Sequence, residues 1–355
     1  VYEVANDLDA GVIFETMNDR GRPLTELEKV KNYLLYVCSK LDLPAPHKLA
    51  ERINATWAHI FEELMAAGLS DSDNEDQLLR AHWLAIYDYD QKKWNQSRSI
   101  KDRFALKTFQ GQHTQLLNEI IEYLDTLKNA ATAYCDLHRP LRANAFNDIA
   151  DSSLRQQVVY YSDKLARLGA RASFQPLLIA VRLKANDGGQ CYLETVQLCE
   201  KYDFRIFQWM RRQPRSGQSQ LFRLGNEYFH NVNNQALRTG ILQTLLSYCN
   251  ETQFQDGFRE GGDWYHWNGL RYFLYEYEQH LAERAEKPVK MPWEVLVRSR
   301  REDTIEHILP QTPTDEYWIK RFTPEAQERW THDYGNLTIT YDNNPMKNKP
   351  FRKGQ

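Results

Sequence analysis

Apolar residues recur at helical spacing along most of this sequence, and no other feature constrains the fold as strongly. Residues 49–67 form such a pattern, and Gly68 follows it as a C-terminal cap. Glycine (16) and proline (13) are sparse for 355 residues, and strand-like runs are few. The sequence therefore predicts a mainly α fold built on a helical bundle scaffold. Further helices are predicted at 112–135, 151–168, 173–185, 190–212, 233–249 and 268–286.

The N-terminal region departs from this pattern. Residues 11–16 are predicted to form a short strand that runs into the polar turn 18–21. Thr25 and Glu28 then have the spacing of a capping box, which predicts that a helix begins there. The acidic run 71–76 predicts a polar loop.

Composition excludes several classes of protein. Lys plus Arg number 45 against 48 Asp plus Glu, a net charge of -3, so a globally basic nucleic-acid binder is excluded while a local basic face is not. Because no apolar run approaches the roughly 18 residues of a membrane span, we expect no membrane partner. The five cysteines are scattered without a C-x-x-C pair, which is typical of reduced thiols and predicts a cytoplasmic protein.

Common catalytic templates are missing from the sequence. There is no G-x-x-x-x-G-K-[ST] phosphate loop, no G-x-G-x-x-G fingerprint, no H-E-x-x-H zinc helix and no G-x-S-x-G nucleophile elbow. The common nucleotide-binding and hydrolase classes therefore lose their sequence support.

The C-terminal segment carries residues with a chemically useful layout. His307 lies in a strand-like run at 304–309, and Asn336 opens a second run at 336–341. This layout is typical of a ββα-metal nuclease hairpin, in which a histidine deprotonates water and an asparagine holds the histidine in orientation. A histidine packed in a strand and an asparagine placed for turn chemistry are the alternatives for each residue taken alone.

Oxygen-rich side chains around the hairpin predict a divalent metal ion. Asn344 and Asn348 follow the second run, and such ligands suit one Mg²⁺ or Mn²⁺ ion rather than Zn²⁺. Glu306 is a further candidate, but neighbours in a regular strand point to opposite faces. Glu306 can therefore share a site with His307 only where the strand end is irregular.

Three stretches of this segment carry a family resemblance. Glu-His-Ile-Leu-Pro-Gln (306–311), Gly-Asn-Leu-Thr (335–338) and Asn-Lys-Pro-Phe (348–351) resemble the HNH-type nuclease domain at the C-terminus of GmrSD-type restriction endonucleases. The first stretch is also similar to the HNH domain of RNA-guided nucleases. At the other end of the chain, residues 14–25 resemble a motif that closes the ParB-like nucleotide-binding domain of the same family.

The resemblance implies a role for each matching residue. His307 would be the general base, Asn336 its positioning residue, and Glu306 and Asn344 metal ligands, with Asn348 in reserve. Such enzymes cut phage DNA that carries modified bases or a modified backbone. The resemblance therefore implies a metal-dependent DNA endonuclease of the HNH superfamily, with a C-terminal ββα-metal (HNH-like) nuclease hairpin, acting in antiphage restriction of modified DNA.

The nucleotide-binding part is expected to be incomplete. The family's Asp-Gly-Gln-Gln-Arg motif does not occur in this sequence, so we expect NTP binding only if that segment is supplied. Asn18 and Arg20 are weak nucleotide-contact candidates, and a capped turn before a helix explains them equally well. The helix that follows the second nuclease strand is expected to be short or missing. The predicted domains are a nucleotide-domain remnant (1–42), a helical connector (43–250) and a nuclease domain (251–355).

Arginines and lysines near aromatic residues or beside the hairpin are candidates for contacts with DNA phosphates. Solvated helix faces are the alternative for most of these positions, and the aromatic run 264–277 is expected to be core. The candidate DNA-binding residues are Arg211, Arg212, Arg215, Arg300, Arg301, Lys347, Lys349 and Lys353.

Two rival functions remain open on the sequence. One is a helical DNA-binding or regulatory module whose nuclease hairpin is inactive. The other is a nucleotide-driven switch, which needs the missing upstream motif. The sequence also leaves open a homo-oligomer, the modification that is sensed, and nicking against double-strand cleavage.

Overall fold

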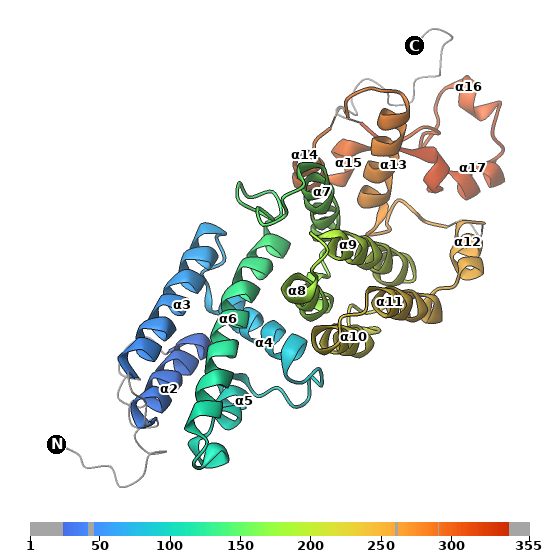
Figure 1. Cartoon of the computed structure of the whole chain (residues 1–355). Helices are drawn as coiled ribbons and strands as arrows, with labels where there is room; N and C mark the ends of the chain where they lie inside the picture. Colours follow the sequence, from blue (N-terminus) through green and yellow to red (C-terminus); the bar gives the residue numbers. More distant parts are fainter. Residues whose placement is uncertain (1–23, 42–45, 260–261, 290, 341–355) are drawn as a thin grey trace. The chain divides into compact units, whose positions relative to one another are not determined.

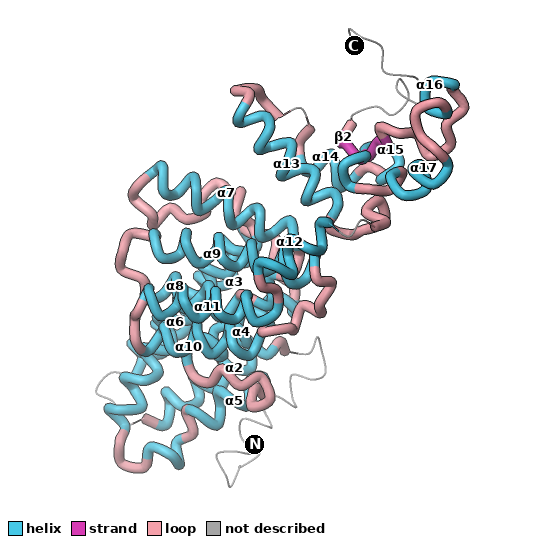
Figure 2. Tube along the Cα trace, turned by 90° about the vertical axis from the view of Figure 1, so that its right-hand side faces the viewer, coloured by secondary structure: helices cyan, strands magenta, loops and turns pink. Residues whose placement is uncertain are grey.

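The structure is a computed structural model that describes residues 24–41, 46–259, 262–289 and 291–340. Helices make up most of these ranges, and strands occur only beside α15 (Figures 1 and 2). The chain forms two compact units: unit 1 holds the residues up to Asp203 and Gln213–Ser247, and unit 2 holds Phe204–Arg212 and the residues from Tyr248 onward. The predicted mainly α fold is confirmed. The predicted division at 42/43 and 250/251 stays a proposal.

Unit 1 is an all-helical body. No helix in the described ranges is long and apolar enough to cross a membrane. The elements of unit 1 are α2 (Glu26–Lys40), α3 (Pro46–Ala66), α4 (Ser72–Ile86), α5 (Gln96–Arg103), the 3₁₀ turn η1 (Leu106–Phe109), α6 (His113–His138), α7 (Ser152–Leu168), the 3₁₀ turn η2 (Arg171–Ser173), α8 (Gln175–Lys184), α9 (Gln190–Tyr202), α10 (Gln218–His230) and α11 (Asn234–Tyr248).

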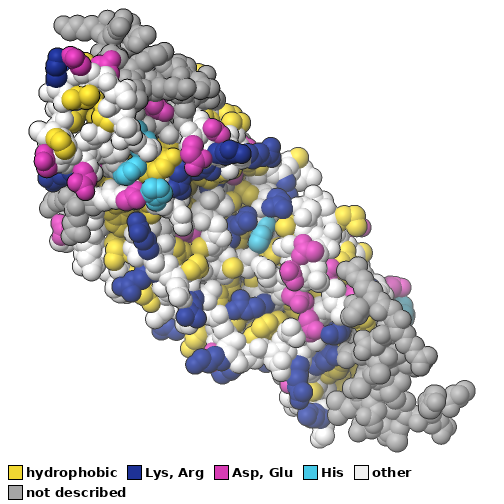
Figure 3. Space-filling view, turned by 180° about the vertical axis from the view of Figure 1, so that it is seen from behind, with side chains coloured by type: hydrophobic (Ala, Val, Ile, Leu, Met, Phe, Trp, Pro, Cys, Tyr) yellow, Lys and Arg dark blue, Asp and Glu magenta, His cyan; other side chains and the backbone are white. Residues whose placement is uncertain are grey.

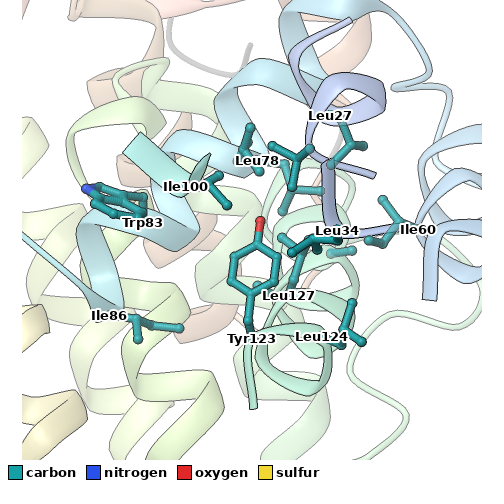
Figure 4. Close-up of a cluster of buried hydrophobic side chains, with 14 of the residues drawn as sticks. Leu27, Leu34, Ile60, Leu78, Trp83, Ile86, Ile100, Tyr123, Leu124 and Leu127 are labelled. Atoms are coloured by element: carbon teal, nitrogen blue, oxygen red, sulfur yellow. The ribbon is translucent and has the colours of Figure 1, made fainter. Parts of the chain in front are cut away.

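Caps and apolar faces explain why these helices form. The predicted capping box is present at the start of α2, where Thr25 N donates to Glu28 Oε2 (2.8 Å) and Glu28 N donates to Thr25 Oγ1 (3.2 Å). Gly68 ends α3 with φ at 65°, a left-handed conformation that glycine adopts without steric cost. The apolar faces of α2 to α6 meet in one core, which includes fully buried Leu34 and Tyr123 (Figure 4).

Two predictions of secondary structure, one of a loop and one of a helix, are wrong. The run 71–76 is not a loop: Asp71 caps α4 by accepting a hydrogen bond from Asn74 N (2.9 Å), and the acidic side chains of Asp73 and Glu75 suit the positive end of the helix. The stretch 190–212 is not one helix. It consists of α9 followed by a π-helical segment, η3 (Asp203–Trp209), and the two units divide inside it.

Unit 2 surrounds a cluster of aromatic side chains. Trp209 from η3 stacks on Phe258 (ring centroids 3.9 Å apart) and on Trp264 (4.8 Å), and Trp267 Nε1 donates to Gln208 O (2.8 Å). The prediction that the aromatic run 264–277 is core is confirmed for Trp264, Trp267 and their buried neighbours. The other elements are α12 (Glu251–Arg259), α13 (Leu270–Arg284), α14 (Trp293–Arg298), α15 (Arg301–Thr304), β1 (Ile305–His307), α16 (Glu316–Ile319), α17 (Pro324–Trp330), the 3₁₀ turn η4 (Tyr334–Asn336) and β2 (Leu337–Ile339).

The two strands form a small antiparallel sheet. Glu306 pairs with Thr338, and His307 pairs with Leu337. Both strands are shorter than the predicted runs 304–309 and 336–341, and Asn336 lies in η4 immediately before β2 rather than in the strand. The segment after β2, where the helix of a ββα unit would follow, lies outside the described residues beyond 340.

Candidate active site

His307 lies at the end of β1 with only 8% of its surface exposed. Both of its ring nitrogens have polar neighbours. His307 Nε2 lies 3.1 Å from Nδ1 of His332, and Gln311 Nε2 lies 3.1 Å from His307 Nδ1. The ring of Tyr265 packs against the imidazole, with centroids 4.6 Å apart. The imidazole is thus held by hydrogen-bonding groups on both nitrogens and by an aromatic ring.

The environment of His307 keeps its imidazole neutral. Burial lowers its pKa to about 4, and the neighbouring imidazole of His332 adds to the shift. A neutral imidazole carries a lone pair on one nitrogen and can therefore accept a proton near pH 7.

Asn336 binds the backbone on both sides of the site. Its Oδ1 accepts from Leu309 N (2.6 Å), and its Nδ2 donates to Leu309 O (3.1 Å) and Thr331 O (2.8 Å). Leu309 follows His307 by two residues, and Thr331 directly precedes His332. The side chain of Asn336 therefore joins the two segments that carry the paired histidines, and its described hydrogen bonds go to backbone atoms rather than to an imidazole.

The sequence interpretation missed several residues around His307. The rings of His332 and Tyr265 stack with centroids 5.6 Å apart, and Trp264 N donates to His332 O (2.9 Å). His266 lies 5.7 Å from His332 between ring centroids, and its Nδ1 lies 2.6 Å from Asp263 Oδ2. The one available signal was proximity, because His332 lies only four residues before Asn336. Nothing in the sequence indicated Tyr265, His266 or Asp263.

Glu306 differs from His307 in its surroundings. The β1–β2 pairing is regular at both positions, so the two side chains leave opposite faces of the sheet. Burial raises the pKa of the Glu306 carboxyl. Within the described part of the chain, this carboxylate makes no ion pair or hydrogen bond.

The described ranges hold no group of three or more His, Cys, Asp or Glu side chains that could bind a metal ion. The predicted ligands Asn344 and Asn348 lie outside those ranges, so the complete predicted ligand set is not described. The predicted DNA contacts Lys347, Lys349 and Lys353 and the predicted nucleotide contacts Asn18 and Arg20 also lie outside the described residues.

The arginines predicted to bind DNA lie in different parts of the structure. Arg301 belongs to the site: Nη1 donates to Tyr265 O, and the guanidinium lies 5.8 Å from the Tyr265 ring centroid. Arg300 is exposed one residue earlier. Arg211 and Arg212 are exposed in unit 2, and exposed Arg215 belongs to unit 1. Lysine and arginine side chains are interspersed with acidic ones on the face drawn in Figure 3, where some histidine side chains lie together and others are isolated.

Unit 2 has an open cavity of about 540 Å³ beside Asp263. Trp209, Arg211, Asp256 and Trp264 line it together with Asp263, the hydrogen-bond partner of His266. Arg211 has φ at 52°, which is uncommon for a residue other than glycine. The cavity therefore lies beside the Asp263–His266 pair, and the His266 ring centroid is 5.7 Å from that of His332.

The fold and the site define a mainly helical protein whose C-terminal unit presents a buried, neutral histidine on a short two-stranded antiparallel sheet. Residues 249–354 match the family model of GmrSD restriction endonucleases, C-terminal domain. The C-terminal third of the chain is thus similar to the C-terminal domain of GmrSD restriction endonucleases, and the resemblance noted in the sequence is confirmed for this part. Neither the curated proteins nor the solved structures include a significant match to the chain.

Proposed function

We propose that this chain is a DNA endonuclease of the HNH superfamily in which His307 is the general base. The main support for this proposal is the buried imidazole of His307, whose pKa is lowered to about 4. This residue lies near the middle of the segment that matches a restriction endonuclease domain. A base for phosphodiester hydrolysis must be unprotonated at working pH and must lie in a fixed orientation. His307 meets both requirements.

In the proposed reaction, His307 accepts a proton from water as the water oxygen attacks phosphorus. The bond from phosphorus to the 3′ oxygen breaks, and that oxygen leaves with the bonding electron pair. Arg301, which is held against Tyr265 beside His307, contacts a phosphate next to the cut. The ring of Tyr265 and the burial of His307 limit access of bulk water to the base.

A single Mg²⁺ or Mn²⁺ ion would polarise the phosphate and stabilise the leaving oxygen when bound. Glu306 is a partly buried carboxylate without an ion pair or hydrogen bond in the described ranges, but it leaves the face of the sheet opposite His307, so it can be a ligand of this ion only if the end of β1 rearranges when the ion binds. Asn344, with Asn348 in reserve, completes the proposed set. The proposed ββα-metal hairpin consists of β1, β2 and the segment beyond residue 340.

The biological role proposed for the chain is antiphage restriction of modified DNA in the cytoplasm. In this proposal, residues 1–42 are the remnant of a ParB-like domain, 43–250 are a helical connector, and 251–355 are the nuclease. DNA is the partner, and exposed Arg211, Arg212, Arg215 and Arg300 supply further phosphate contacts. NTP acts only when the upstream nucleotide-binding segment is present.

Plasmid cleavage tests this function. The wild-type chain and the His307→Ala variant are incubated with supercoiled DNA, modified and unmodified, in Mg²⁺, Mn²⁺ or EDTA. We expect metal-dependent cutting that falls by about a hundredfold or more in His307→Ala, since general bases contribute at least that factor. His280→Ala is the matched control, because His280 is exposed on α13.

Fluorescence anisotropy with labelled DNA completes the test. Equal DNA affinity of wild type and His307→Ala would show that the variant lost chemistry rather than binding. Full cleavage by His307→Ala would refute the general-base assignment. Salt-sensitive binding without metal-dependent cutting by the wild type would favour the DNA-binding module instead.

A further inference from the structure

His332 makes a direct ring-to-ring contact with the proposed base. Its Nδ1 lies 3.1 Å from His307 Nε2, a normal hydrogen-bond distance between nitrogens. One of these two nitrogens must carry the proton, and a neutral imidazole protonated on one nitrogen has its lone pair on the other. The direction of this hydrogen bond therefore determines which nitrogen of His307 can act as the base.

Gln311 gives the direction of that bond. Its amide nitrogen lies 3.1 Å from His307 Nδ1 and 3.5 Å from His307 Nε2, so its closer contact is with Nδ1, and an amide nitrogen can only donate. His307 Nδ1 is therefore the acceptor and holds the lone pair, which places the proton of the neutral ring on Nε2. Nε2–H then donates to Nδ1 of His332.

His332 is itself held in place. Its carbonyl oxygen accepts from Trp264 N (2.9 Å), and Asn336 Nδ2 donates to the carbonyl of the preceding residue, Thr331 (2.8 Å). The ring of Tyr265 stacks on the imidazole of His332 at an interplanar angle of 28°. An acceptor supported in this way can fix both the tautomer and the rotation of the ring that donates to it.

We propose that His332 is the positioning residue of His307: it accepts a hydrogen bond from Nε2–H and thereby presents Nδ1 to the attacking water. The catalytic consequence rests on the proposed function, while the hydrogen bond does not. The role of Asn336 is then indirect, because its side chain joins the backbone segments of the two histidines. Gln311 donates to the same lone pair, so its amide must move away from Nδ1 before a water can donate there.

Two substitutions separate the hydrogen bond from the bulk of the ring. His332→Leu removes the acceptor and keeps an apolar side chain against Tyr265. His332→Asn places an amide oxygen close to the position of the imidazole Nδ1 and can therefore accept the same bond. His280→Leu, on the exposed face of α13, is the control for loss of a histidine.

Nitrogen NMR tests the tautomer in the full chain without DNA. Long-range ¹H–¹⁵N spectra of ¹⁵N-histidine protein show which ring nitrogen is protonated, and the His307→Ala spectrum assigns the signal. We expect His307 to be protonated on Nε2 in wild type and in His332→Asn, and to become a mixture of both tautomers in His332→Leu. Protonation on Nδ1 in wild type, or an unchanged tautomer in His332→Leu, would overturn the proposal.

Cleavage kinetics test the consequence. We expect His332→Leu to lower kcat by about 10- to 100-fold, the usual effect of losing an orienting partner, with KM changed less than about twofold. His332→Asn should recover most of kcat. Equal kcat in His332→Leu and wild type, or no recovery in His332→Asn, would overturn the positioning role. A wild-type chain that does not cut DNA would instead refute the proposed function, and the spectra would still decide the hydrogen bond.

Discussion

Asn336 gives the sharpest test of how the site is assembled. Its side chain makes three hydrogen bonds to buried backbone, at 2.6 Å and 3.1 Å to Leu309 and at 2.8 Å to Thr331. Asn336→Ala removes all three and leaves the backbone N–H and the two carbonyl groups without these partners. The change adds no bulk and no charge, so the loss of the hydrogen bonds dominates the outcome.

The magnitude follows from these contacts. A typical buried hydrogen bond contributes about 1 kcal/mol net, and each orphaned buried group costs about 1–3 kcal/mol. Asn336→Ala should therefore lower the local unfolding free energy of the hairpin by roughly 3 kcal/mol. At about 1.4 kcal/mol for each factor of ten, this corresponds to roughly a hundredfold faster hydrogen exchange at the backbone of residues 305–311 and 331–339.

Hydrogen exchange measured by mass spectrometry provides the readout. Asn336→Asp keeps an acceptor for Leu309 N but places an oxygen opposite the carbonyls of Leu309 and Thr331, so it should protect the hairpin no better than alanine. Asn147→Ala is the control, because Asn147 is exposed and its side chain makes two long hydrogen bonds, one to Asn144 Oδ1 (3.4 Å) and one from Arg155 Nη1 (3.3 Å). Exchange in Asn336→Ala within about threefold of wild type, a change below 1 kcal/mol, would refute the reasoning.

Three further predictions concern the stability of the two units. Burial lowers the pKa of His82 to about 3, so the unfolded chain binds its proton first and the unfolding free energy falls as pH drops below 6.5. His82→Gln cannot titrate, and urea unfolding at several pH values should show a slope shallower by up to about 1.4 kcal/mol per pH unit. Gly225→Ala should cost about 1–3 kcal/mol in thermal unfolding, because the added Cβ would lie 2.7 Å from Leu177 Cα, and an unchanged Tm would contradict this packing. Trp209→Ala should destabilise unit 2 by about 3–5 kcal/mol, measured by hydrogen exchange in α12 and α13; unaltered exchange there would contradict the aromatic cluster.

Sequence periodicity predicts the long helices because their apolar stripes record how they are buried. The predicted helices 112–135 and 151–168 correspond to α6 and α7 within a few residues. α4 was missed because Asp71 and the acidic residues after it have loop-like composition. The same residues are favourable as an N-cap and in the first turn of a helix. The capping preference therefore indicated the start of α4, whereas the acidic composition suggested a loop.

The division of the chain into units could not be predicted from periodicity. The pattern over 190–212 continues through η3, because a π-helical segment keeps side chains at nearly helical spacing. Trp209 nevertheless belongs to the aromatic cluster of unit 2, whose other members lie far along the chain. Only tertiary contacts reveal that this unit begins with a segment that precedes residue 249, where the family match starts.

Local sequence pointed to His307 and Asn336 as candidate site residues but not to the hydrogen bonds around them. A motif records residues that lie close together in the chain, whereas the His307–His332 pair joins positions 25 residues apart. The pair forms because Asn336 binds the backbone at Leu309 and at Thr331, which fixes the separation of the two imidazoles. In the proposed site, Asn336 and His332 therefore act on His307 through the same contact. The effects of the two substitutions on kcat should not be additive. Once His332→Leu has removed the acceptor that orients His307, loosening the backbone with Asn336→Ala can disturb that orientation little further.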